Sequence, residues 1–353
     1  MKPKNVTIKD IARAGGVSHS TVSRALNNHP AISKATRERI IALSQEMGYV
    51  PNATARGLKT NRTRALGVIL RQIDDPYWSE VLDGVDSVLQ AKGYSMFIAC
   101  THDDKQRGKE VARAMVERGV DGVILGGLRF SEEKSHILSS YDLPMVMINN
   151  EDVGQFRYVI SNDHYHGARM ITKHLIELGH TRLAYLGKRY AGIPNSDRLA
   201  GFHTEMKAAG LPIEKQYIYH TLPPNPIGGR EGAEYFLSLD AIPSGIICYN
   251  DYIAVGVYDY LKEKGLHIPG DISIAGYDDI FIASFLSPPL TTFHQNKFEM
   301  GQRAAEMMLE VLSDRRVGER ESSAPKKVVL RGNLKVRAST RSFTMRESIK
   351  LAD

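Results

Sequence analysis

The segments TIKDIARAGGVS (residues 7–18) and HSTVSRALN (residues 19–27) decide the fold of the N-terminal part of the chain. Apolar residues at helical spacing predict two short helices, and the pair Gly15-Gly16 predicts the turn between them. The second helix opens with small polar side chains. A helix-turn-helix needs this arrangement, because its second helix enters the major groove of DNA with its first turns against the base edges. The alternative is a small three-helix bundle with a polar surface.

The helix ends can be placed from residue types. Thr7 and Ser18 are expected to cap the two helices, Ser33 to open a third helix and Gly48 to end it. The side chains expected to point inward are Ile8, Ile11, Ala12, Val22, Ala25, Leu26, Ile40, Ile41, Leu43 and Met47. The side chains of the second helix that are left pointing outward are His19, Ser20, Ser23 and Arg24.

Positive charge is concentrated in this part of the chain. Residues 1–64 carry 12 Lys/Arg against 3 Asp/Glu, whereas residues 65–353 carry 34 against 37. A local excess of positive charge indicates that residues 1–64, the head of the chain, have a polyanionic partner that the rest does not share. Because this charge coincides with the polar opening of the second helix, a DNA-binding head is favoured over a plain helical bundle.

The bulk composition sets limits on the rest of the chain. A length of 353 residues allows two or three domains with full cores, and 42% hydrophobic residues are typical of globular proteins. Cys100 and Cys248 each end an apolar run that reads as a buried strand, which favours a reducing compartment without disulfides. The sequence shows neither a signal peptide nor a transmembrane run, so the expected location is the cytoplasm.

The third helix is followed by GYVPNATARGLKTNRT (residues 48–63) and then by an α/β pattern. In this order the motifs resemble those of the LacI/GalR family of bacterial transcription regulators, from residue 6 to about residue 343. The resemblance implies a hinge helix over residues 52–59 that folds on operator DNA and inserts a leucine into the minor groove. Such a short helix is marginal alone, so the residues by themselves leave a flexible basic linker as an equal alternative.

The resemblance also implies which residues contact DNA. His19, Ser20 and Arg24 match the base-reading positions, and Arg24 can fork onto a guanine. The matches to phosphate-binding or helix-capping positions are Thr7, Ser18, Thr21, Ser23 and Asn27. The contacts implied for the hinge are Asn52, Ala53, Ala55, Arg56, Leu58 and Lys59, with Leu58 as the wedge.

Strand and helix patterns alternate from residue 65 onward. Short apolar runs such as Ala65–Leu70 and Gly122–Leu125 alternate with amphipathic stretches such as Tyr77–Lys92, and a similar series starts near Asn162. This alternation predicts parallel sheets covered by helices on both faces. The expected fold is therefore an α/β body of two doubly wound parallel-sheet lobes with an N-terminal all-α helix-turn-helix domain. The resemblance implies lobes like those of periplasmic sugar-binding proteins.

The expected domain boundaries follow from the same pattern. They are 1–50 for the helix-turn-helix domain, 51–64 for the hinge and linker, 65–162 plus 294–324 for the N-terminal lobe, 163–293 plus 325–343 for the C-terminal lobe, and 344–353 for the tail. The tail lacks the leucine heptads of a tetramerisation helix, so a homodimer is expected.

Loops at the predicted strand ends are rich in polar and aromatic groups, and ligands of such sheets bind beyond the carboxyl ends of the strands. The loops are Asp74–Trp78, Asp197-Arg198, Asn250-Asp251 and Tyr277–Asp279. The resemblance implies that Arg198, Asn250 and Asp278 hydrogen-bond a polar effector. It also implies an opposite wall of Asp75, Tyr77 and Trp78. Carboxylates, an amide and an arginine beside an aromatic face suit a sugar.

Each of these residues also has a purely structural alternative. Asp278 and Asp279 could cap a following helix, and Asn250-Asp251 could cap the helix after them. Arg198 could form an ion pair between the lobes. Tyr77 and Trp78 could belong to the hydrophobic core.

Catalytic signatures are missing from the sequence: it has no Walker A motif, G-x-S-x-G elbow, H-E-x-x-H motif or metal-spaced Cys/His cluster. No enzyme, cofactor or metal is therefore expected. One alternative is a helix-turn-helix fused to a sugar kinase, which would need an ATP-phosphate loop that the sequence does not show. Another is a transport-binding protein, which would need a signal peptide and would have no basic N-terminal domain.

The expected function is that of a repressor of carbohydrate-metabolism genes. It is expected to act as a homodimer on pseudo-palindromic double-stranded operator DNA, at the nucleoid of the bacterial cytosol and away from membranes. A small-molecule effector in the inter-lobe cleft, expected to be a sugar, controls it. The sequence leaves open whether the effector is instead a purine, a sugar acid, a phosphorylated sugar or a protein co-regulator. It also leaves open whether the effector releases the operator or is needed for binding to it.

Overall fold

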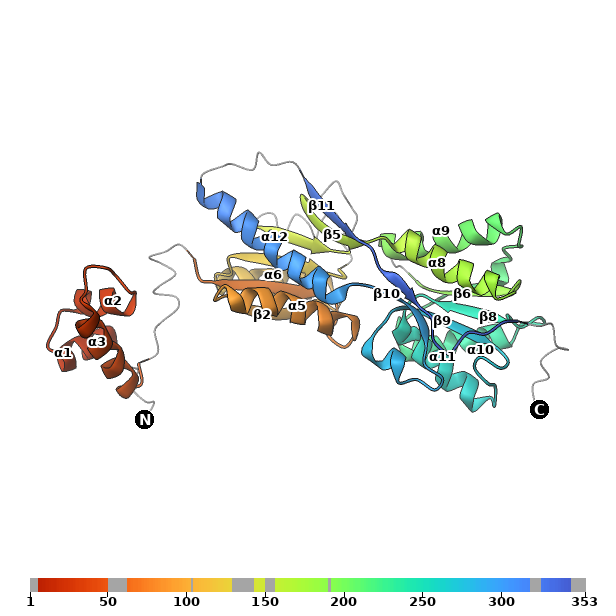
Figure 1. Ribbon diagram of the computed structural model, residues 1–353, viewed down its shortest axis with the longest axis horizontal. Helices are drawn as coiled ribbons and strands as arrows, with labels where there is room; N and C mark the ends of the chain where they lie inside the picture. Colours follow the sequence, from red (N-terminus) through yellow and green to blue (C-terminus); the bar gives the residue numbers. More distant parts are fainter. Residues whose placement is uncertain are drawn as a thin grey trace. The chain divides into compact units, whose positions relative to one another are not determined.

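The computed structural model describes residues 6–49, 62–102, 104–128, 143–149, 156–189, 192–317 and 325–343. By their internal contacts, residues 1–63 and 64–353 form two compact units (Figure 1). The first unit contains helices only, among its described residues, whereas the second is an α/β structure with two sheets.

The first unit consists of three helices, α1 (Ile8–Gly15), α2 (His19–Leu26) and α3 (Lys34–Glu46). The caps predicted at Thr7, Ser18 and Ser33 are confirmed, because each side chain accepts a hydrogen bond from the backbone N–H three residues later. At Thr7 the bond is reciprocal, since the Asp10 carboxylate accepts from the backbone N–H of Thr7. Gly16 ends α1 in the left-handed conformation with φ 64°.

The core of this unit is small. Its buried members are Ile11, Ala12, Val22, Ala25 and Ile40, with Ile8, Leu26, Leu43 and Met47 partly buried against them. The inward position predicted for Ile41 is wrong, because 38% of this side chain is exposed. Ile40 takes the inward position on α3, and the next residue along a helix points about 100° away from it.

The first lobe of the second unit contains a six-stranded parallel sheet in the order β11-β5-β4-β3-β1-β2. The strands are β1 (Ala65–Leu70), β2 (Ser95–Cys100), β3 (Gly122–Gly126), β4 (Met145–Ile148), β5 (Tyr158–Asn162) and β11 (Lys326–Leu330). Helices α5 (Tyr77–Ala91) and α12 (Lys297–Val317) pack in one hydrophobic core, and α6 (Lys105–Glu117) packs in another. Apolar layers of this kind cover both faces of the sheet.

The second lobe contains a six-stranded sheet in the order β12-β10-β9-β8-β6-β7. Its strands are β6 (Leu183–Lys188), β7 (Ile218–Thr221), β8 (Gly245–Cys248), β9 (Ser273–Asp278), β10 (Thr291–His294) and β12 (Asn333–Lys335), of which only β12 runs antiparallel to its neighbour. Helices α8 (His164–Glu177) and α9 (Gly192–Ala208) share one core, and α10 (Pro226–Leu237) and α11 (Asp251–Glu263) share the other. Short 3-10 helices η1 (Lys215–Tyr217) and η2 (Phe281–Ser284) complete the described elements. The prediction of two doubly wound lobes is confirmed.

The chain crosses between the lobes three times, between β5 and α8, between β10 and α12, and between β11 and β12 (Figure 1). The third crossing was placed wrongly by the sequence-based boundary, which put residues 325–330 in the second lobe. The structure pairs β11 with β5 in the first sheet, from Lys326 opposite Tyr158 to Leu330 opposite Asn162. This strand therefore completes the first lobe, and only β12 belongs to the second.

A membrane-crossing helix would have to be long and apolar, and no helix in the described part of the chain meets that requirement.

Candidate functional site

Helix α2 presents a polar surface. His19, Ser20 and Arg24 are exposed, whereas Val22 and Ala25 are buried on the opposite side of the helix. The three exposed residues are therefore available to an external partner such as a DNA groove.

The residues matched to phosphate-binding or capping positions take part in local hydrogen bonds. Ser18 Oγ lies 2.7 Å from Ser20 Oγ and 2.8 Å from Thr21 Oγ1, and Asn27 Nδ2 donates to the carbonyl of Ser23 over 2.7 Å. The capping alternative thus applies to Thr7 and Ser18, and Asn27 stabilises the carboxyl end of α2. The hinge residues Asn52, Ala53, Ala55, Arg56, Leu58 and Lys59 lie outside the described residues.

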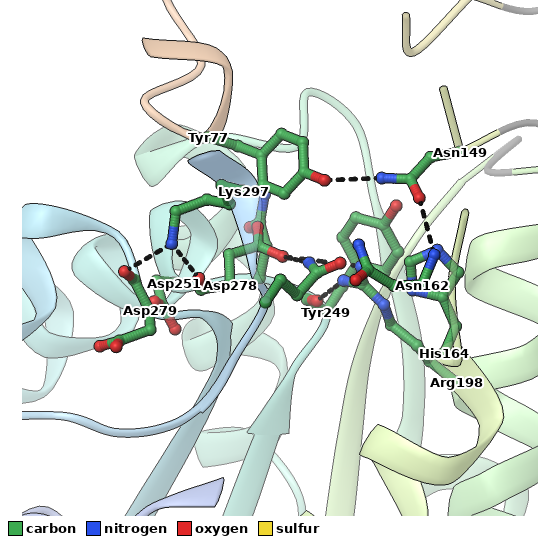
Figure 2. Close-up of polar contacts among 12 residues, drawn as sticks. Tyr77, Asn149, Asn162, His164, Arg198, Tyr249, Asp251, Asp278, Asp279 and Lys297 are labelled. Carbon is green, nitrogen blue, oxygen red and sulfur yellow. Dashed lines mark hydrogen bonds and ion pairs between the residues drawn. The ribbon is translucent and has the colours of Figure 1, made fainter. Parts of the chain in front are cut away.

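A second polar cluster forms where strands of both lobes end (Figure 2). From the first lobe it receives Tyr77 at the start of α5, Asn149 after β4 and Asn162 at the end of β5. Asn149 Nδ2 donates to the Tyr77 hydroxyl over 2.7 Å, and Asn149 Oδ1 accepts from the backbone N–H of Asn162 over 3.2 Å. Tyr77 is also a core residue, so both readings of Tyr77 hold: its ring is in the core and its hydroxyl is in the cluster.

Arg198 on α9 lies at the centre of the cluster and is 4% exposed. Its guanidinium is held between two rings, 4.4 Å from the centroid of Tyr249 and 3.7 Å from that of Tyr277. Nη1 donates to the carbonyl of Tyr249, and Nη2 lies 3.3 Å from Nδ1 of His164. The ion pair of Arg198 is with Asp278, at 3.6 Å, and Asp278 belongs to the same lobe. The alternative of an ion pair between the lobes is therefore wrong.

Asp278 ends β9 and faces Arg198. Burial raises the pKa of its carboxyl to about 7, against the opposing effect of Arg198, and the negative charge of Asp75 adds to the rise. Gln295, directly after β10, donates from Nε2 to Oδ1 of Asp278. Asp278 caps no described helix, since η2 begins after Ile280 and has no side-chain cap. Its carboxylate is instead part of the polar cluster.

Asp279 has a structural role of its own. Its carboxylate accepts from Nδ1 of His294 over 2.9 Å and from Nη2 of Arg337 over 2.6 Å. Burial alone would raise its pKa, but these two partners lower it to about 2. The triad of side chains ties the ends of β9 and β10 to the segment after β12.

Asn250 and Asp251 follow β8 and largely fit the capping alternative. Oδ1 of Asn250 accepts from the backbone N–H of Ile253 over 2.9 Å and so caps α11. Asp251 is fully buried and accepts from the Thr292 hydroxyl and from the backbone N–H of Ile280. An amide oxygen can accept two hydrogen bonds, so this cap does not exclude the expected effector contact of Asn250.

Asp75 and Trp78 flank Tyr77 in the first lobe. Oδ1 of Asp75 accepts from the backbone N–H of Tyr77 over 3.1 Å, and burial raises the pKa of this carboxyl. Trp78 belongs to the core cluster, and it packs against Gly126 and Gly127 at the carboxyl end of β3, where any side chain would overlap its ring.

Lys297 was not singled out from the sequence, although it is fully buried. Its ammonium donates to the carbonyls of Asp278 and Asp279, over 2.6 and 2.8 Å (Figure 2). It also lies 3.3 Å from the Glu80 carboxylate on α5. Asp278 and Asp279 both have positive φ, 111° and 54°, which is strained for residues with a side chain. Lys297 therefore holds an unusual bend of the second lobe and links it to the first.

Several buried polar atoms of the cluster have no hydrogen-bond partner among the described residues. They are Oδ1 of Asn162, Nε2 of His164, Nε of Arg198, the hydroxyl of Tyr277 and Oε1 of Gln295. Leaving such groups unpaired costs about 1–3 kcal/mol each, so their concentration in one place makes the cluster a candidate binding site. Asn162 and His164 lie at the end of β5, and the same strand-end rule applies to Asp278 at the end of β9, whereas Arg198 lies inside α9.

In the described residues no group of three or more His, Cys, Asp or Glu side chains is arranged to hold a metal ion. Cys100 and Cys248 are both free thiols.

Two segments match known families. Residues 7–52 match the bacterial regulatory proteins of the lacI family, and residues 172–340 match a periplasmic binding protein-like domain. Among solved structures, the lac repressor dimer bound to operator and an anti-inducer superposes with a TM-score of 0.84 at 24% identity, over 96% of this chain and all of that chain. A transcriptional regulator CelR–cellobiose complex superposes with a TM-score of 0.71 at 25% identity, over 95% of this chain and all of that chain.

Whole-length relatives carry the name HTH-type transcriptional repressor PurR. The protein of Vibrio parahaemolyticus is 33% identical over 337 residues, which cover 93% of this chain and 98% of the relative. The protein of Haemophilus influenzae strain PittEE is 32% identical, over 96% of this chain and 99% of the relative. Such relatives are regulators and not enzymes. The chain belongs to the LacI family of bacterial regulatory proteins and is a helix-turn-helix transcriptional repressor with an effector-binding domain.

Proposed function

We propose that a small molecule bound between the two lobes, at the cluster around Arg198, controls the affinity of this repressor for its operator. The observation that carries the proposal is the set of buried, unpartnered polar atoms around Arg198 and Asp278. A bound ligand would supply their missing partners. The same ligand would touch Tyr77 and Asp75 of the first lobe and Arg198 and Asp278 of the second, so its binding energy would depend on how the lobes are arranged.

A sugar is the favoured effector, and the genes of carbohydrate metabolism are the favoured targets. Two similar regulators were solved with sugars: CelR with cellobiose, at 25% identity, and a LacI-family regulator of Enterococcus faecalis V583 with ribose, at 27% identity over 79% of this chain. The cluster offers carboxylate, amide and guanidinium groups beside tyrosine rings, which suit hydroxyls and the apolar face of a pyranose or furanose. In this arrangement Arg198, Asn250 and Asp278 bind hydroxyls, while Asp75, Tyr77 and Trp78 form the opposite wall.

The proposed DNA-binding form is a homodimer on a pseudo-palindromic operator. Each head places α2 in a major groove, where His19, Ser20 and Arg24 read bases while Thr7, Ser18, Thr21, Ser23 and Asn27 position the helix. Between the heads, residues 52–59 fold as hinge helices, with Leu58 as the minor-groove wedge. Such a protein works where its operator lies, in the bacterial cytosol.

Apolar surface on the second unit fits a second copy of the chain. Phe97 and Ile98 are exposed on β2, which is an edge strand, and Phe281 and Phe285 are exposed around η2. Exposed aromatic side chains and an open strand edge are features that a stable dimer would cover.

Selection of binding sites from random DNA, followed by an effector screen, tests the proposal. The full-length protein is expected to select a palindrome of two half-sites. Sugars are then added singly, binding is followed by the fluorescence of Trp78, the only tryptophan, and each hit is tested for its effect on operator affinity. A sugar that binds and changes operator affinity supports the proposal, whereas binding to Arg198→Ala with unchanged affinity would place the site elsewhere.

A further inference from the structure

The unpartnered atoms around Arg198 restrict the chemistry of the ligand that can complete them. We propose that the effector is an uncharged molecule that presents both N–H or O–H donors and an acceptor, and that Gln295, Asn162 and His164 select it against phosphorylated or acidic analogues. This inference rests on the proposed function and goes beyond it, because it assigns specificity to three residues and excludes whole ligand classes.

Gln295 offers an acceptor. The side chain is fully buried, and its Nε2 donates to the Asp278 carboxylate. When Asp278 is ionised, this bond fixes the orientation of the amide, since a carboxylate accepts from the nitrogen and not from the oxygen. Oε1 is therefore left without a donor among the described residues. A ligand that fills this position must bring an N–H or O–H group.

Asn162 offers a second acceptor. It is 1% exposed, and its Nδ2 has only the sulfur of Met300 at 3.9 Å as a partner, which is a weak acceptor. Its Oδ1 has no donor in the part of the chain that the structure describes. Gln295 comes from the second lobe and Asn162 from the first, so a ligand with two donors would contact both lobes.

His164 offers a donor. The guanidinium of Arg198 has donors only, so Nδ1 of His164 must accept from Nη2 across their 3.3 Å separation. Burial, and then the charge of Arg198, lower the pKa of His164 well below its usual value, so the ring is neutral and carries its proton on Nε2. This Nε2–H is buried and has no described acceptor. A ligand oxygen or ring nitrogen would satisfy it.

The positive groups next to these atoms are already engaged. Arg198 contacts the carbonyl of Tyr249, His164 and Asp278, which leaves only Nε without a partner. Lys297 is bound to two carbonyls and to Glu80. Negative charge enters the same region through Asp278 and Asp75, and the charge of Asp75 is partly offset by Arg71 and Lys188.

An anionic ligand would therefore be poorly matched. A phosphate or carboxylate brings acceptors to Gln295 and Asn162, which also accept, and places its charge beside Asp278, whose own charge burial already disfavours. Adjacent hydroxyls of a sugar, or the N–H and C=O groups of a nucleobase, offer the required mixture of donors and acceptors. Sugars and nucleobases thus share an uncharged set of neighbouring donors and acceptors. Probes of each kind distinguish which of the two the site binds.

Matched pairs of probes test the selectivity with the full-length protein. The pairs are D-ribose with ribose 5-phosphate, cellobiose with cellobionate, and hypoxanthine with inosine 5′-monophosphate, each titrated by calorimetry and by Trp78 fluorescence. The uncharged member of at least one pair is expected to bind at least about tenfold more tightly than its anionic partner. Tighter or equal binding of the anionic member would overturn the inference but leave the proposed function intact. Binding by none of the probes, or binding that leaves operator affinity unchanged, would overturn both.

Variants then test the assignment to individual residues. Gln295→Leu and, separately, His164→Phe are expected to weaken binding of the uncharged probe by about tenfold. Gln106→Leu, which changes an exposed glutamine on α6, is the matched control and should bind like the parent protein. Unchanged probe affinity in both site variants would refute the specificity role, and a melting temperature measured for each variant separates lost contacts from lost folding.

Discussion

Asp278 shows how a single residue can join binding and stability. It lies at the end of β9 with Arg198 at 3.6 Å and Gln295 as a donor, yet burial holds its pKa near 7. Its backbone bend is held by the buried ammonium of Lys297. The carboxylate is thus ready to accept hydrogen bonds from a ligand, at a cost in the stability of the folded protein.

The pH dependence of the free energy of unfolding should reflect the raised pKa of Asp278. Because the folded protein holds the proton of Asp278 up to about pH 7 and an unfolded aspartate loses it near pH 4, this group stabilises the fold at low pH and its contribution is lost as the pH rises toward 7. Urea unfolding at pH 5 and pH 8 measures the effect. The parent protein should lose on the order of 2 kcal/mol more than Asp278→Asn over this range. Parallel losses in the two proteins would contradict the raised pKa.

Arg24 is the clearest candidate base reader of α2, because it is exposed and a guanidinium can bind guanine with two hydrogen bonds. Arg24→Ala should relax the base preference at one operator position, at a cost of about 1–3 kcal/mol. Selection from random DNA checks this. Arg13→Ala, an exposed arginine on α1, is the control and should keep the site of the parent protein. If Arg24→Ala also keeps it, Arg24 does not read a base.

At the scale of elements, the predictable parts are those with local signals. The caps at Thr7, Ser18 and Ser33 and the alternation of strands and helices followed from residue types, and the strand-end rule pointed to Asp278, whereas Arg198 lies inside α9 and was singled out by the family resemblance. The unpartnered atoms of Asn162 and His164 could not be foreseen, because they depend on which residues from distant segments pack beside them.

Some elements depend on tertiary packing and carry little local signal in the sequence. Helix α10 contains three glycines and reads poorly as a helix, but Gly229 lies where a methyl group would come within 2.0 Å of the carbonyl oxygen of Ile253. Its helical state thus reflects a close approach to α11. Residues 325–330 were assigned to the second lobe, but β11 belongs to the first because it pairs with β5, which no local signal records.

The α10–α11 contact gives a stability test at this scale. A methyl group at Gly256 on α11 would lie 1.8 Å from the carbonyl oxygen of Pro226, so Gly256→Ala should destabilise the protein by about 1–3 kcal/mol or more. Gly108→Ala on α6 meets nothing within 4 Å and should instead stabilise it by up to about 1 kcal/mol. Thermal and urea unfolding measure both. A neutral Gly256→Ala would show that the two helices separate readily.

At the scale of the whole molecule, Lys297 is a direct link between the lobes. Its ammonium bonds the backbone at the end of β9 in the second lobe and lies beside Glu80 in the first. An effector that shifts Asp278 would therefore also shift the Lys297 ammonium, and through it α5 and α12. Coupling of about 1–3 kcal/mol is enough to change operator occupancy.

Removal of this link should reduce coupling. Lys297→Met keeps the length of the side chain but removes the ammonium, and the ligand-induced change in operator affinity should fall, while the head still binds operator without ligand. Lys326→Met removes a half-exposed ion pair with Glu310 and should leave coupling unchanged. Paired operator titrations with and without ligand give the coupling of each protein. Full coupling in Lys297→Met would exclude the lysine as a link.

The central claim is that a ligand at Arg198 and Asp278 controls DNA binding by the head. The most direct measurement is the operator dissociation constant of the parent protein and of Asp278→Ala, with and without a ligand that binds the parent. We expect equal operator affinity without ligand, a change of about fivefold or more on adding ligand to the parent protein, and no change in the variant. A ligand response that survives in Asp278→Ala would contradict it.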